Sequence, residues 1–322
     1  TLLGFVPQIL GIGLPLLFLK PGPGGVIEWQ LLMLIIAGAA GSTLYFSSYY
    51  IKENKWARNG ETLGFIDSIK ETLKNKQFLI LEVSIFSLLI VSTMITTGLL
   101  YLFNYVFIVD NTLEYLYFGI PIFALVGTIF FFNKFVPKLG VKKIFMAGSI
   151  IGAIGFAILP LFGRRLSVLF IPITLIAVGF SAIIIGQQPL MADVIDYDEI
   201  FTGKRRETTY SGVNALITKA AISIANWAFL EILKAFKYDP KLETQLYPDT
   251  IAQGVILAFT IIPVIAVIFS TIALYFFKLD GKEWLLKKLD LEKHHQEKER
   301  EYVEKLKEKG VLGPDPKKLP KS

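Results

Sequence analysis

The sequence contains no cysteine and only two histidines, His294 and His295, which are adjacent in a charged tail. The lack of cysteine excludes disulfides, thiolate nucleophiles and cysteine-ligated metals. No histidine lies within an apolar stretch, and there is no HExxH motif. Charged residues are scarce too, at 19% of the chain against 53% hydrophobic residues. We therefore expect neither an enzyme nor a bound cofactor or metal.

The apolar residues come in blocks that are separated by charged segments, and the mean hydropathy is +0.55. A soluble domain needs more polar surface, whereas a bilayer imposes this pattern on spanning helices. About eight blocks have the roughly 18–30 residues that cross a hydrocarbon core. The sequence thus predicts an all-α polytopic membrane protein with spans at residues 1–19, 29–50, 78–108, 114–137, 144–162, 167–190, 208–235 and 251–277.

Lysine and arginine are concentrated in alternate gaps between these spans. By the positive-inside rule, those gaps and both ends of the chain face the cytoplasm. We therefore expect a multi-pass protein of the cell membrane. The basic residues on this side are Lys52, Lys55, Arg58, Lys70, Lys74, Lys76, Lys134, Lys138, Lys142, Lys143, Lys204, Arg205 and Arg206.

The longest internal gap divides the spans unequally and contains an amphipathic stretch, residues 63–73, which is typical of a helix on the inner membrane surface. Many transporters join two six-helix halves through a cytoplasmic linker. Since Thr1 already lies in an apolar run, we expect four further spans upstream and twelve in the whole protein. The expected parts are the last two helices of an N-terminal half (1–50), a linker (51–77), a six-helix C-terminal half (78–277) and a cytoplasmic tail (278–322). Acids nearly balance bases in that tail, so nucleic-acid binding is not expected.

A segment dense in charge follows the sixth predicted span. Ion pairs at the cytoplasmic mouth of a transporter can close one face and break when it opens. An ordinary solvated loop explains the charges alone equally well. The gate candidates are Asp193, Asp196, Tyr197, Glu199, Thr202, Gly203, Arg205, Arg206 and Glu207.

The spacing D-x-x-D-Y-x-E-x-x-T-G-x-R-x-E of residues 193–207 strongly resembles the loop between the tenth and eleventh helices of the glycoside–pentoside–hexuronide:cation symporters. This is the melibiose-permease-like branch of the major facilitator superfamily. Residues 1–6, 73–78, 136–143 and 277–281 resemble other parts of the same family. The resemblance implies a major-facilitator-type bundle that carries a sugar or glycoside together with Na⁺ or H⁺.

The chain departs from that pattern at three points. Asp198 stands where the family usually has glycine, and Thr208 where glycine is common. A tryptophan of the family's tenth helix aligns near Ile184. The family's cation-coordinating acids belong to its second and fourth helices, so the resemblance assigns no cation site within this chain.

Lys219 lies about eleven residues into the seventh predicted span. An ammonium at that depth costs roughly 2.5–3.5 kcal/mol on insertion scales, so we expect it to face a wet cavity or a partner. The alternative is a side chain that snorkels or pairs with a structural acid. A functional lysine occupies the matching position in the melibiose-permease-like branch, which favours the cavity.

Other polar residues within the spans are weaker cavity candidates. Hydroxyls and amides can both donate to and accept from a sugar, but they join neighbouring helices equally well. These candidates are Tyr210, Asn214, Thr97, Tyr101, Asn104 and Gln187. The partners predicted for this site are therefore a small-molecule substrate and the lipid bilayer, in a protein expected to be a monomer.

Three functions remain open from the sequence. The first is cation-coupled symport of a sugar or glycoside by alternating access. The second keeps the fold but carries an amphipathic solute such as a lysolipid, which the 26 phenylalanines allow. The third is a fragment that does not transport by itself.

Overall fold

The computed structural model describes residues 23–50, 65–108, 117, 119–242 and 244–308. Within these ranges the chain is helical and contains no β-strand. It forms two units, Thr1–Glu61 with Glu297–Ser322 and Thr62–Gln296. The first predicted span, residues 1–19, lies outside the described residues. The described part of the first unit is the long helix α2 (Pro23–Tyr50) with the last turns of α11.

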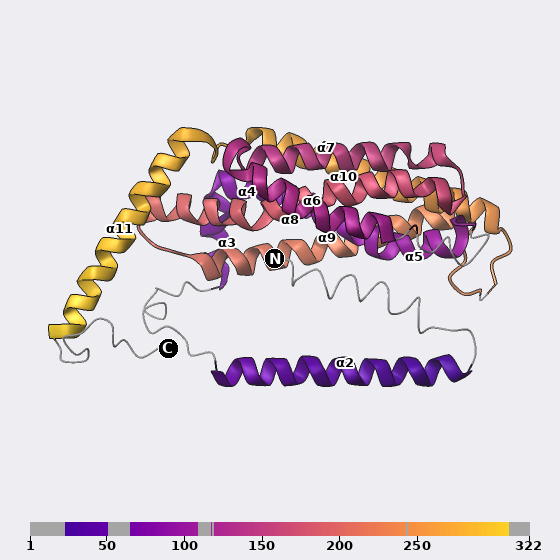
Figure 1. Ribbon diagram of the computed structural model, residues 1–322, viewed down its shortest axis with the longest axis horizontal. Helices are drawn as coiled ribbons and strands as arrows, with labels where there is room; N and C mark the ends of the chain where they lie inside the picture. The colour runs from indigo at the N-terminus through magenta and orange to yellow at the C-terminus, as the bar shows by residue number, and fades with distance from the viewer. Residues whose placement is uncertain (1–22, 51–64, 109–116, 118, 243, 309–322) are drawn as a thin grey trace. The chain divides into compact units, whose positions relative to one another are not determined.

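The second unit is a bundle of long helices that run side by side (Figure 1). Seven helices of the described chain, one of them in α2, are long and apolar enough to cross a membrane. This confirms the all-α polytopic fold that the hydropathy blocks predict. The elements of this unit are α3 (Phe65–Lys74), α4 (Lys76–Thr93), the π-helical η3 (Met94–Gly98), α5 (Leu99–Tyr101), the π-helical η4 (Leu102–Val106), α6 (Gly119–Leu139), α7 (Val141–Ile158), the 3₁₀ turn η6 (Leu159–Phe162), α8 (Leu166–Thr202), α9 (Glu207–Ala235), α10 (Pro248–Phe276) and α11 (Gly281–Glu308) as far as Gln296.

Helix α8 is longer than predicted. The sequence predicts that a span ends at residue 190 and that a polar loop follows, but α8 continues to Thr202. Pro189 does not end it, and the charged segment forms its last three turns. The helix stops at Gly203, which has the left-handed φ of 68° and donates its N–H to the Glu199 carbonyl. Glycine adopts this conformation without steric cost. The motif is therefore an ordered helix end rather than a loop.

Helices α7 and α8 contact each other through glycine. A Cβ atom on Gly179 of α8 would lie 2.4 Å from the Gly152 nitrogen and 2.5 Å from the Gly148 oxygen of α7. Small residues let two backbones approach this closely, which is the usual device for helix packing in a membrane. The backbones of α7 and α8 are therefore closely packed against each other.

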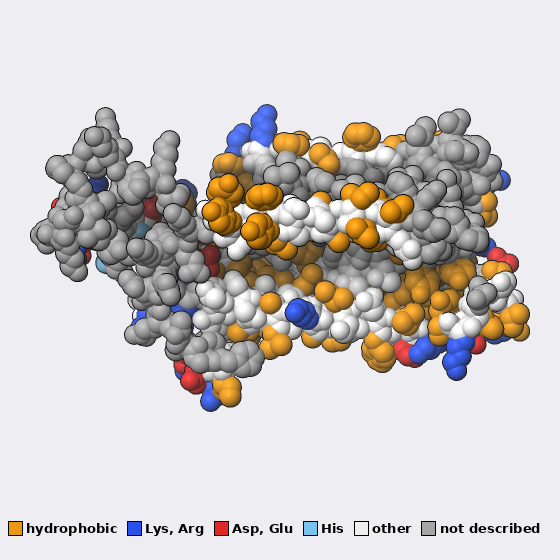
Figure 2. Space-filling view, turned by 90° about the horizontal axis from the view of Figure 1, so that it is seen from below, with side chains coloured by type: hydrophobic (Ala, Val, Ile, Leu, Met, Phe, Trp, Pro, Cys, Tyr) orange, Lys and Arg blue, Asp and Glu red, His pale blue; other side chains and the backbone are white. Residues whose placement is uncertain are grey.

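Two groups of buried side chains fill the bundle, one around Phe156, Phe229 and Phe259 and the other around Phe78 and Phe145. Large apolar side chains also cover the outside, and Phe123 of α6 is 79% exposed. Charged side chains gather toward the ends of the helices, while hydrophobic side chains cover much of their length (Figure 2). That distribution is the one expected of a surface in contact with lipid.

Candidate functional site

The charged motif is folded around a buried ion pair between the end of α8 and the start of α9. Arg206 Nε lies 2.8 Å from Asp198 Oδ2, and Arg206 Nη2 lies 2.5 Å from Asp198 Oδ1. Only 11% of the Arg206 side chain and 7% of the Asp198 side chain are exposed. The hydrogen bond to Asp198 raises the pKa of Arg206, so the guanidinium stays charged. Asp198, a departure from the pattern of the symporter family, is thus the main partner of Arg206.

Arg205 contacts a second set of acids, of which only Glu207 is exposed. Its Nη1 atom lies 3.1 Å from Glu199 Oε2 and 3.2 Å from Asp196 Oδ1, and its Nε atom lies 3.5 Å from Glu207 Oε2. The Arg205 side chain is 44% exposed. The structure therefore brings four of the predicted gate residues into one network.

Two further gate candidates stabilise the turn. The Thr202 hydroxyl donates to the Asp198 carbonyl at 2.8 Å, and Gly203 supplies the left-handed helix end described above. Their role in this structure is to fix the angle between α8 and α9, and with it the positions of Arg205 and Arg206.

The amphipathic helix α3, predicted as part of the linker, reaches the same cluster. Glu71 Oε2 lies 3.6 Å from Arg206 Nη1. A hydrogen bond from Lys74 and the charges of Lys74 and Arg206 lower the pKa of Glu71. Asn75, which caps α4 through its side-chain oxygen, donates its Nδ2 to the Tyr210 hydroxyl at 3.0 Å. These contacts join α3 and α4 to the start of α9.

Tyr210 is fully buried and packs against Phe78 with ring centroids 5.0 Å apart. The sequence suggests that it lines a cavity with Lys219. The two residues are nine positions apart, however, and nine positions place them on opposite sides of a helix. In this structure Tyr210 is a packing residue and does not belong to the open face that carries Lys219.

The first turns of α11 also dock on the motif, at the end of the bundle where α3 lies (Figure 1). Lys288 Nζ lies 2.6 Å from Asp193 Oδ1, and His295 Nε2 lies 2.6 Å from Glu199 Oε1. The sequence predicts only a cytoplasmic tail here, because the partners of Lys288 and His295 are about 95 residues away. The spacing of seven residues, which puts both on one helix face, is the signal that could have found them.

Trp284 is the apolar part of this contact. It is 8% exposed, and its ring centroid lies 6.2 Å from that of Tyr197. Tyr197 therefore helps to hold α11 in place, together with the contacts of Asp193 with Lys288 and of Glu199 with His295. All nine predicted gate residues thus lie at one end of the bundle.

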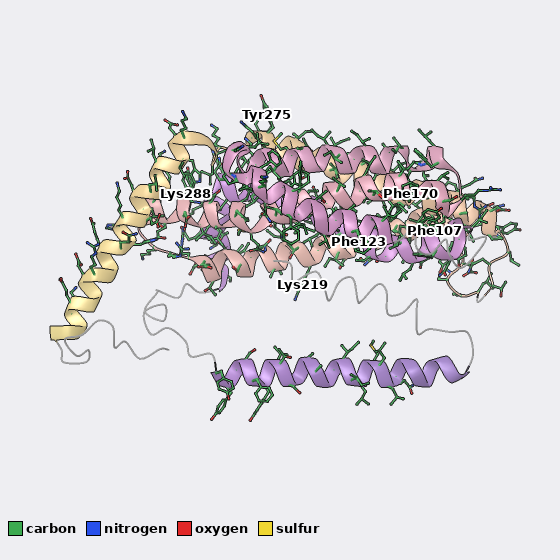
Figure 3. The ribbon with its side chains drawn as sticks, in the orientation of Figure 1. Phe107, Phe123, Phe170, Lys219, Tyr275 and Lys288 are labelled. Carbon is green, nitrogen blue, oxygen red and sulfur yellow. The ribbon has the colours of Figure 1, made fainter. Side chains whose placement is uncertain are left out.

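Lys219 lies elsewhere, on the exposed face of α9, and its side chain points away from the other helices of the bundle (Figure 3). The same face carries small or polar residues at helical spacing. These exposed residues are Thr208, Gly212, Ala215 and Ser223. Asn226, which the sequence reasoning missed although it lies seven positions after Lys219, accepts a hydrogen bond from Thr97 at 3.2 Å. Thr97 therefore joins two helices beside the face of Lys219.

The other cavity candidates are scattered. The half-buried Tyr101 packs against Phe229 and Tyr238 with centroids 5.1 Å and 5.7 Å away. Asn104 is exposed in η4, whereas Gln187 is partly buried in α8 just before Pro189. The buried Oδ1 atom of Asn214 has no hydrogen-bond partner among the described residues. The span Lys76–Val106 contains two π-helical segments, η3 and η4, close to Thr97 and Tyr101. Such segments are frequent at functional sites.

The described residues contain no group of three or more histidines, cysteines or acids that could hold a metal ion. The ion pairs instead form a structured charge cluster at one end of an apolar helix bundle. A bundle of this kind, with polar residues inside its spans, is typical of a multi-pass membrane transporter.

A comparison with protein families shows the family of the chain. The family described as MFS/sugar transport protein matches residues 10–281, and the chain belongs to this family. It is therefore a secondary transporter of the major facilitator type. A comparison with curated proteins gave no match.

Proposed function

We propose that this protein carries a sugar or glycoside together with Na⁺ or H⁺ by alternating access, as in the melibiose-permease-like symporters. In this proposal the face of α9 around Lys219 lines the substrate pathway, and the α8–α9 cluster lies at the cytoplasmic mouth. The family match supports transport of a small molecule, and the spacing of residues 193–207 supports the particular branch.

The observation that carries the proposal is the exposed strip of small and polar residues on α9, with Lys219 at its centre. Lys219 lies twelve residues after Glu207 and sixteen before Ala235, which is about 18 Å and 24 Å along the helix. It is thus near the middle of the span. A lysine side chain that faces lipid there costs roughly 2.5–3.5 kcal/mol, whereas one that faces a wet pathway does not.

A comparison within the molecule supports the same assignment. The exposed face of α6 presents Phe123, Phe130 and Phe131, as a lipid-facing helix should. The exposed side of α9 instead presents a narrow strip of Ala215, Lys219 and Ser223, with Leu216 and Ile222 on its two borders. Small and polar side chains make poor contact with acyl chains, but they leave room for water, a substrate or a second helix. The two faces therefore serve different surroundings.

The test is uptake by the full-length transporter in proteoliposomes with an imposed Na⁺ or H⁺ gradient. We expect Lys219→Ala to lose most of the uptake while the protein still inserts and unfolds at the wild-type temperature. Lys234→Ala is the matched control, because Lys234 lies on the same helix but pairs with Glu231 near its end. Wild-type uptake by Lys219→Ala would refute the pathway assignment, and a failure of every sugar to compete would refute the proposed substrate class.

A further inference from the structure

A groove opens on the side of the bundle between α4, α9 and α10. It has a volume of about 550 Å³. Its rim is formed by the exposed side chains of Leu79, Val83, Ile265 and Phe269. It runs along α4 from Leu79 to Ile90, which is about 16 Å at the rise of an α-helix. The groove is therefore long, narrow and apolar.

One acid lies in this apolar groove. Glu82 is 4% exposed, and neither of its carboxylate oxygens has a hydrogen-bond partner among the described residues. The other polar residue of the lining, Ser87, already donates its hydroxyl to the Val83 carbonyl at 2.8 Å. None of the described residues that line the groove is basic. The lining thus offers nothing that compensates the carboxyl group.

The depth of Glu82 makes this arrangement costly. Glu82 is six residues after Lys76, the first residue of α4, which places it about 9 Å inside the span. Phe269, across the groove, is seven residues before the end of α10. Burial of an acid without a partner at such a depth is expensive, and intramembrane acids usually mark a bound partner or a transport pathway.

The groove is distinct from the polar face of α9. Ile217 lines the groove and Lys219 is only two residues further on, but two residues turn the helix by about 200°. Glu82 therefore has a different environment from Lys219 and needs a partner of its own.

We propose that this groove binds a membrane-soluble amphiphile with a single hydrocarbon chain and a primary amine head group. Both Glu82 oxygens are covered in this structure, so the carboxylate turns toward the groove and accepts hydrogen bonds from the ammonium group near the charged end of the bundle. The chain lies along the apolar walls between Val83 and Ile265 toward Ile90. The amine then forms a charged hydrogen bond with Glu82, and the hydrocarbon chain is buried against the apolar walls.

The experiment uses the full chain in lipid nanodiscs at pH 7 and three probes with the same dodecyl chain and a diazirine at its end. The probes are an amine, an alcohol and a carboxylic acid, and mass spectrometry maps the cross-links. We expect saturable labelling of α4 and α10 by the amine alone. Glu82→Gln should weaken this binding roughly 10–100-fold, since it removes a charged hydrogen bond.

Two further variants separate binding from folding. Val83→Phe fills the rim of the groove and keeps Glu82, and Val83 is 47% exposed, so the larger side chain has room. It should abolish saturable labelling by itself, and the proposal fails if it does not. Glu231→Gln removes an exposed acid outside the groove and should change nothing. Equal labelling by the three probes would show partition into lipid or a merely protonated carboxyl, and would overturn the proposal.

Discussion

The Arg206–Asp198 pair should be the largest single electrostatic contribution to the stability of the α8–α9 turn. Arg206→Met removes the cation beside Asp198, whose side chain is only 7% exposed. Removing one partner of a buried ion pair typically costs about 3–5 kcal/mol, since the remaining charge is desolvated. Replacing both partners by apolar residues, in Arg206→Met with Asp198→Leu, should recover most of that loss.

Arg205→Met is the matched control. It removes the neighbouring guanidinium, but the Arg205 side chain is 44% exposed and Glu199 keeps its contact with His295. Although Glu199 is itself buried, its remaining contact with His295 and the half-exposed position of Arg205 should keep the loss at about 1 kcal/mol, near that of an exposed pair. The two arginines are adjacent in sequence and carry the same charge, so the comparison shows the effect of how deeply each guanidinium is buried.

Thermal unfolding of the purified chain, followed by helical circular dichroism, measures these effects. The Arg206→Met variant should melt about 6–20 °C below the wild type, and the Arg205→Met variant should melt within a few degrees of it. The reasoning is refuted if the two single variants are equally stable. It is also refuted if the double variant is less stable than Arg206→Met.

Two further predictions concern packing and the tail. Gly179→Ala should destabilise the protein by about 1–3 kcal/mol, because the new Cβ atom would meet the α7 backbone. Gly127→Ala is the control and should be neutral, because no atom lies within 4 Å of its Cβ position. Equal melting temperatures of the two variants would contradict the close α7–α8 contact. Lys288→Ala with His295→Ala should speed amide hydrogen exchange over residues 281–296, since the ion pair with Asp193 and the hydrogen bond with Glu199 are both lost. Lys287→Ala should leave the exchange unchanged, and equal exchange in all variants would mean that α11 is held by Trp284 alone.

The spans could be predicted from the sequence because the bilayer fixes their length and polarity. The prediction of residues 208–235 differs from α9 (Glu207–Ala235) by one residue at its start. The end of α8 was missed because the charges of Asp193 to Glu199 resemble a loop, although the Thr202–Gly203 pair marks a helix end.

The contacts within the site were harder to predict than the residues. Sequence spacing brings Tyr210 within reach of Lys219 only if the helical phase is ignored. The partners of Arg206, Lys288 and His295 depend on how α3, α8 and α11 meet in space, and this cannot be found from a local pattern. The isolation of Glu82 is likewise a property of its neighbours on α10 and not of its own segment.

The structure divides the charged residues of the predicted gate into a buried pair and a set of exposed side chains. A gate residue has to exchange partners when the two halves of a transporter move apart. Arg206 and Asp198 lie in one helical hairpin, buried and eight residues apart, so a movement between halves does not have to break them. Arg205 and Glu207 are 44% and 64% exposed and can also reach a partner bundle. We therefore expect charge reversal at Arg205 to slow the transport cycle, and charge reversal at Arg206 to unfold the hairpin that presents it.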